Sequence, residues 1–73
     1  MRVSAICYDP DVRLGLSLVG IETKEVHNND ELTRCFHQLV SDKDVGVILL
    51  DPQLSLYLDT LELDASNKMI VTI

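Results

Sequence analysis

Three aspartates are the residues of this chain whose type and spacing could support chemistry. Asp9 and Asp11 follow a short apolar run, and Asp51 follows a second apolar run further along the chain. If the two runs are neighbouring parallel strands, their carboxyl ends meet at one edge of a sheet, where open α/β sheets bind ligands. Carboxylate oxygens are the ligands that Mg²⁺ prefers. The three aspartates are therefore a candidate site for a cation or a phosphoryl group.

The same aspartates also have a purely structural interpretation. Asp9 and Asp51 each precede a proline, in the steps Asp9-Pro10 and Asp51-Pro52. A carboxylate at an N-cap accepts hydrogen bonds from the free N–H groups of the first helical turn. Proline is favoured at the first helical position because the N–H group that it lacks would have no partner within the helix. We favour this interpretation, in which Asp11 is an ordinary first-turn acid. A degenerate receiver-like domain that binds Mg²⁺ or a phosphoryl group at the three acids is the alternative.

Other patterns of catalytic residues are absent from the sequence. His27 and His37 lack metal-ligand spacing to each other or to a cysteine. The few serines and histidines form no recognisable nucleophile–base motif, and the three glycines form no phosphate-binding loop. We therefore predict a protein that is not an enzyme, with no catalytic residue, no metal and no cofactor.

Apolar runs alternate with helical patterns along the chain, and this alternation predicts the fold that positions the aspartates. We predict strands over 3–8, 21–26, 45–50 and 69–73, and helices from 10 to about 19 (closed by Gly20), from Asn28 to about 40, and from about 53 to 63. The order βαβαβαβ implies a parallel sheet with right-handed crossovers. We expect one α/β domain over residues 1–73, with a small open four-stranded sheet in the order 2-1-3-4, of the Rossmann-like or flavodoxin-like type.

Several elements carry more specific predictions. The first helix is apolar on most sides, which predicts deep packing, with Gly15 allowing a close approach to a neighbour. Asn28 and Glu31 have the spacing of a capping box at the start of the second helix. The run Val45–Leu50 has no polar face, which is typical of a strand at the centre of a parallel sheet.

The third helix has more apolar residues than one face of a sheet covers. Leu56 and Leu63 fall outside the stripe that faces the core, and Tyr57 lies near its edge. One interpretation is that the last strand and its loop bury them. The other is that Leu56, Tyr57 and Leu63 form a partner-binding surface, since an exposed apolar patch usually marks an interaction site.

The composition excludes several classes of function. The net charge is −6, aromatic residues are few, and the six basic residues are scattered, so we expect no nucleic-acid binding. The longest uninterrupted apolar stretch, Val47–Leu50, is far too short to span a membrane. Cys7 and Cys35 form no CxxC pair and are typical of small buried residues in a reducing compartment. These features favour a cytoplasmic protein.

Three segments resemble the F-subunit family of the V-type and archaeal-type rotary ATPases (ATP synthases). The sequence 9–21, DPDVRLGLSLVGI, matches the family's acidic turn and short glycine-containing helix. The sequence 44–50, DVGVILL, resembles its central strand, and 67–73, NKMIVTI, resembles its fourth strand. The similarity and the lengths between the segments cover essentially the whole chain.

The resemblance implies a non-catalytic protein of the central stalk, or rotor. Members of this family bind the coiled-coil protein of the stalk, the D-subunit, and contribute to coupling the catalytic hexamer to proton or sodium transport, at the periphery of a membrane-embedded complex. They continue past the fourth strand into a C-terminal helix, whereas this sequence ends at Ile73. We therefore also expect that the bare edge of the last strand allows self-association.

Overall fold

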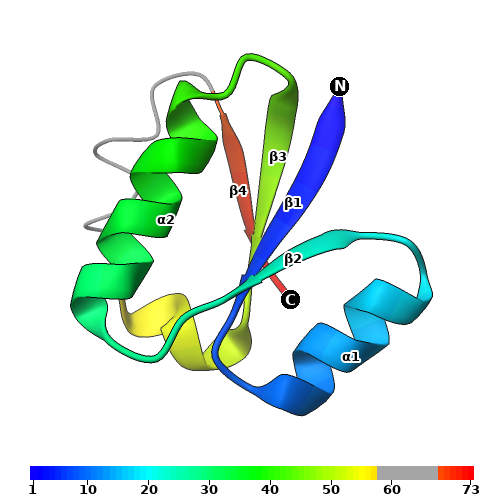
Figure 1. The fold of residues 1–73 in the computed structure, drawn as a ribbon, viewed down its shortest axis with the longest axis vertical. Helices are drawn as coiled ribbons and strands as arrows, with labels where there is room; N and C mark the ends of the chain where they lie inside the picture. The colour runs from blue at the N-terminus through cyan, green and yellow to red at the C-terminus, as the bar shows by residue number, and fades with distance from the viewer. Residues whose placement is uncertain (58–67) are drawn as a thin grey trace.

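The computed structural model describes the backbone of residues 1–57 and 68–73, and the side chains of residues 1–54 and 68–73. Strands and helices alternate in the order that the sequence predicts (Figure 1). The elements are β1 (Arg2–Cys7), α1 (Pro10–Leu18), β2 (Glu22–Glu25), α2 (Asn29–Ser41), β3 (Val45–Leu50), η1 (Pro52–Tyr57) and β4 (Met69–Thr72).

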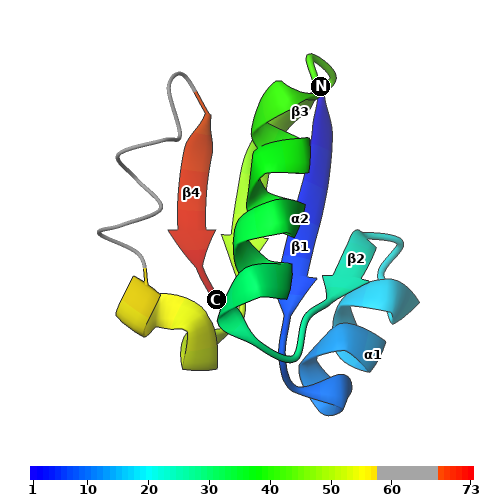
Figure 2. The same cartoon turned by 60° about the vertical axis from the view of Figure 1, so that its left-hand side comes forward.

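The four strands form one parallel sheet in the order β2-β1-β3-β4. This confirms the predicted α/β class, the open sheet and the strand order. β1 and β3 lie in the middle of the sheet, so the turns that follow them are neighbours at its carboxyl edge. α2 packs on one face of the sheet and α1 on the other, as Figures 1 and 2 show.

Local capping explains where the two helices begin and end. Asp9 is the N-cap of α1, with Pro10 at the first helical position, and Gly20 follows the helix with a φ of 85°. That angle lies in the left-handed region, which glycine adopts at little cost. At α2, the side chain of Asn28 accepts a hydrogen bond from the N–H of Glu31 (2.8 Å), and the Glu31 carboxylate accepts one from the N–H of His27 (2.7 Å). The predicted helix-start signals are therefore confirmed.

The core lies between α2 and the face of the sheet that α2 covers. Phe36, Ile6, Ile48 and Leu50 are fully buried there. The amphipathic stripe of α2 supplies its side of this core, as its 3.6-residue period predicts. Leu54, from the predicted third helix, also joins the core. Packing of these apolar side chains is the main source of stability for so short a chain.

The third helical segment differs in form from the prediction. Residues Pro52–Tyr57 form a 3₁₀-helix, η1, where the sequence predicts the start of an α-helix over 53–63. Residues 58–63 of that prediction lie outside the described residues.

The prediction of deep packing for α1 is wrong. The helix has no fully buried residue, and Leu14 and Leu18 are 59% and 78% exposed. A Cβ atom at Gly15 would meet no other atom within 4 Å, so that glycine makes no close approach. The physical reason is position: α1 packs beside the edge strand β2 and next to β1, so only its Val12 and Leu16 side becomes half-buried.

Candidate functional site

Asp51 lies at the carboxyl edge of the sheet, and its carboxylate joins two turns. The side chain is 1% exposed. Its Oδ2 atom accepts hydrogen bonds from the backbone N–H groups of Tyr8 (3.1 Å) and Asp9 (2.8 Å) in the turn after β1. Its Oδ1 atom accepts one from the N–H of Gln53 (2.9 Å) at the start of η1. The carboxylate therefore connects the β1–α1 turn to the β3–η1 turn.

Asp9 and Asp11 lie on the same edge but have separate surroundings. The Asp9 carboxylate accepts a hydrogen bond from the N–H of Asp11 (2.9 Å), which is its N-cap contact on α1. The Asp11 side chain is exposed in the first turn of that helix. The structure thus brings Asp9 and Asp51 together through the backbone N–H of Asp9, whereas Asp11 lies outside this contact.

This geometry bears directly on the cation or phosphoryl alternative. A phosphoacceptor or metal-ligating carboxylate needs an oxygen that faces the incoming ligand. Both oxygens of Asp51 instead accept backbone N–H groups, which is how a buried carboxylate is satisfied in a protein. Within residues 1–57 and 68–73, no group of three His, Cys, Asp or Glu side chains could hold a metal ion. The contacts of Asp51 are those of a residue that fixes two turns.

A groove of about 310 Å³ lies at the same edge, on the side of the sheet covered by α2. None of the three aspartates lines it. Its lining combines amide, imidazole and phenol groups with apolar side chains: Tyr8, Val26, His27, Asn28, Asn29, Leu32, Gln53 and Leu54. The volume is near the lower end for a small-molecule pocket. No sequence pattern indicates this groove, because its walls come from three turns that only the fold brings together.

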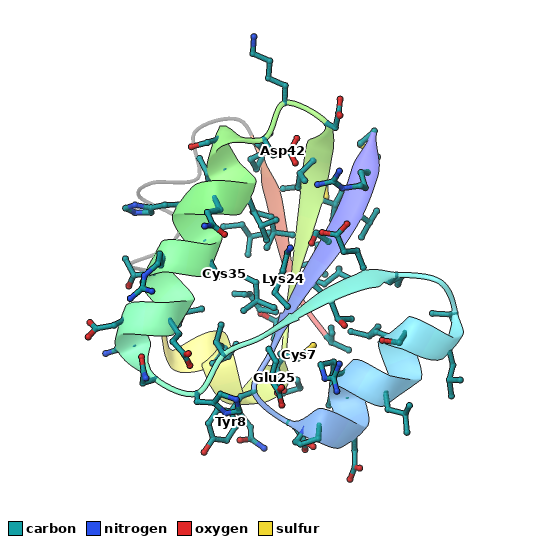
Figure 3. The ribbon with its side chains drawn as sticks, in the orientation of Figure 1. Cys7, Tyr8, Lys24, Glu25, Cys35 and Asp42 are labelled. Carbon is teal, nitrogen blue, oxygen red and sulfur yellow. The ribbon has the colours of Figure 1, made fainter. Side chains whose placement is uncertain are left out.

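The two cysteines are free thiols, Cys7 on β1 and Cys35 on α2 (Figure 3). Cys7 is fully buried at the end of β1, and this burial raises the pKa of its thiol to about 11; the negative charge of Asp51 adds to the rise. Cys35, on α2, is half-buried, and burial raises its pKa as well, with Lys24 acting in the opposite direction. A raised pKa keeps both side chains protonated at neutral pH, and the protonated thiol is the less reactive form.

A second polar cluster holds the opposite, amino edge of the sheet together. The Asp42 carboxylate accepts hydrogen bonds from the N–H of Asp44 (2.9 Å) and the guanidinium of Arg2 (2.6 Å). The bond from Asp44, together with Arg2, lowers the pKa of Asp42. The Lys68 ammonium donates to the carbonyl oxygens of Asp42 (2.6 Å) and Val45 (2.5 Å). These contacts connect the α2–β3 turn to β1 and to the start of β4.

The partner-binding surface predicted on the third helix remains a prediction. Leu63 lies outside the described residues, and Leu56 and Tyr57 lie on η1 at positions whose side chains the structure does not describe. No helix of the described chain is long and apolar enough to cross a membrane.

The fold and the carboxyl edge define a class of protein. It is a small doubly wound α/β domain in which the carboxylates of Asp9 and Asp51 accept hydrogen bonds from backbone N–H groups. The family model of the ATP synthase (F/14-kDa) subunit matches residues 5–73, so the chain belongs to that family. This confirms the resemblance to the F-subunit family of the V-type and archaeal-type ATPases. No curated protein matches the chain.

Proposed function

We propose that this chain is a non-catalytic component of the central stalk of a V/A-type rotary ATPase. In this role it binds the coiled-coil stalk protein (the D-subunit), lies at the cytoplasmic periphery of the membrane-embedded complex, and contributes to coupling between the catalytic hexamer and ion transport. The observation that carries the proposal is the family match over residues 5–73, which covers nearly the whole chain.

The geometry of the carboxyl edge supports a role without catalysis. In open α/β sheets this edge usually holds the ligand. Here the buried carboxylate of Asp51 accepts three backbone N–H groups, and that of Asp9 accepts the N–H of Asp11. The acids of the edge thus serve the fold, as expected of a protein that acts by binding other components of a complex.

Co-expression of the chain with the coiled-coil stalk protein and the catalytic hexamer tests this proposal. We expect the chain to co-purify with the stalk protein, to show no ATP hydrolysis alone, and to change the coupled ATPase activity when it is omitted from the reconstituted complex. A chain that fails to co-purify with the stalk protein, or that hydrolyses ATP by itself, would refute the proposal.

A further inference from the structure

The strand β2 forms one edge of the sheet, and half of its backbone groups point away from the sheet. The N–H of Val26, just after the strand, donates to the carbonyl oxygen of Cys7 on β1 (3.0 Å). Backbone groups alternate between the two sides of a strand from one residue to the next, so those of Thr23 and Glu25 point outward. In the described part of the chain, no strand pairs with this outer side. The edge therefore offers free hydrogen-bonding groups to a further strand.

The side chains of β2 place two opposite charges on one face of this edge. Glu22 pairs with Ser4 of β1 and Lys24 pairs with Ile6, so both charged side chains lie on the face of the sheet that packs against α2. The Lys24 ammonium lies 3.5 Å from a carboxylate oxygen of Glu22, and both side chains are partly exposed. A groove of about 380 Å³ beside Lys24, between β2 and α2, gives room for the side chains of a neighbouring molecule.

An antiparallel copy of β2 fits this edge in one register. When Thr23 lies opposite Thr23 of a second copy, their outward backbone groups form a hydrogen-bonded pair. Glu22 of each chain then lies opposite Lys24 of the other, in the closer, non-hydrogen-bonded type of pair. A shift by one residue exchanges the two faces, and a shift by two places either two Glu22 or two Lys24 side chains opposite each other. Charged residues on an edge strand usually prevent pairing, but here their order favours a single register.

The helix α1 has space beside a second copy of itself in this arrangement. It packs over β2 and β1 on the face opposite to α2 (Figures 1 and 2). Because strands lie about 4.8 Å apart, a two-fold axis at the paired edge places the two α1 helices about 10 Å apart, which is the distance between packed helices. Leu14 and Leu18, which are exposed on α1, are available for this contact.

We propose that the outer edge of β2 is an interface between two copies of this chain, in which the β2 strands pair antiparallel around Thr23 and join the two sheets. The contact is self-complementary, as a two-fold interface requires. It is also short, so we expect a dissociation constant on the order of 10–100 µM. The inference is independent of the proposed function. It concerns the edge opposite to β4, whereas the sequence leads us to expect self-association at β4.

Exchange of the two charges tests this register on the full chain. Lys24→Glu places two carboxylates opposite each other and Glu22→Lys places two ammonium groups opposite each other, so we expect each variant to weaken dimerisation at least about tenfold. Glu22→Lys also reduces the net negative charge of the chain, so general repulsion between chains does not explain a loss there. An equimolar mixture of the two variants restores both pairs of opposite charge, and we expect it to form a heterodimer as readily as the unsubstituted chain dimerises.

Sedimentation equilibrium measures these associations, and circular dichroism checks that each variant is folded. Lys43→Glu makes the same change of charge as Lys24→Glu at an exposed position in the α2–β3 turn, and we expect it to change dimerisation less than about twofold. A mixture of Lys24→Glu and Glu22→Lys that fails to associate, while the unsubstituted chain dimerises, would overturn the inference.

Amide exchange of the unsubstituted chain, followed by NMR, gives a readout that needs no variant. We expect exchange at Thr23 and Glu25 to slow as the chain concentration rises, and exchange at Lys24, whose N–H points toward β1, to change little. A chain that stays monomeric up to about 1 mM would overturn the inference. A dimer that protects 69–73 instead would also overturn it, because β4 would then be the contact edge. Neither outcome bears on co-purification with the stalk protein, so the proposed function is judged separately.

Discussion

Replacement of Asp51 by alanine is the most direct test of the role assigned to the carboxyl edge. The change removes the acceptor of three backbone N–H groups, those of Tyr8, Asp9 and Gln53, from a position that is 1% exposed. The β1–α1 turn then loses its connection to the β3–η1 turn. We expect the variant to be strongly destabilised.

The structure sets the size of this loss. An N–H group left without an acceptor in a buried position costs about 1–3 kcal/mol. Tyr8 is exposed and Asp9 is half-buried, so water replaces part of the lost bonding at these two positions. We therefore expect a loss of about 3 kcal/mol rather than the full sum. A chain of this length has a total stability of about 4–11 kcal/mol, so Asp51→Ala removes about a quarter to three quarters of it.

The assay is urea unfolding followed by circular dichroism. Asp51→Asn keeps one acceptor oxygen but turns an NH₂ group toward the remaining donor, and we expect it to cost about 1–2 kcal/mol. Asp44→Asn, an equal change of charge at an exposed position, serves as the control and is expected to change stability by less than about 0.5 kcal/mol.

The sign of the effect distinguishes the two interpretations of the aspartates. Carboxylates gathered to bind a cation or a phosphoryl group repel one another in the free protein, so removal of Asp51 from such a site would stabilise the fold. Addition of Mg²⁺ with a phosphate mimic would then also shift the amide resonances near Asp9 and Asp51. A gain of stability in Asp51→Ala, or a loss no larger than that of Asp44→Asn, would refute the structural role argued for Asp51.

Two further predictions concern pairs of like residues. Gly20→Ala is expected to lower the free energy of unfolding by about 1 kcal/mol, because φ is 85° at this position. Gly15→Ala is expected to raise it by about 0.5–1 kcal/mol, because Gly15 lies inside an exposed helix with free space around it. Equal urea midpoints for the two variants would contradict this. In the native protein we expect Cys35 to react with a disulfide reagent before Cys7, and to react faster as the pH rises toward its raised pKa. We expect Cys7, which is fully buried, to react only when the protein unfolds. Reaction of both thiols in a single phase would count against the burial of Cys7.

Much of the fold was predictable because its signals are local. The steps Asp9-Pro10 and Asp51-Pro52 mark where α1 and η1 begin, and the capping box of Asn28 and Glu31 marks the start of α2. The apolar run Val45–Leu50 predicts a strand inside the sheet. Each of these signals depends on residues within about one helical turn or one strand, so it can be seen in the sequence itself.

The packing of α1 was not predictable in the same way. The apolar residues of Pro10–Leu18 indicate burial, but the helix lies beside the edge strand β2, where the sheet covers only one side of it. Periodicity says which residues share a face of a helix, and not what covers that face.

The sequence by itself determined the order of strands and helices, their caps and the absence of a catalytic motif, because these depend on neighbours along the chain. The tertiary structure decided two further features: the hydrogen bonds from Tyr8 and Asp9 to the Asp51 carboxylate, and the exposure of Leu14 and Leu18 on α1. Both arise from long-range placement. The first requires β1 and β3 to be neighbours, and the second depends on α1 lying beside the edge strand β2.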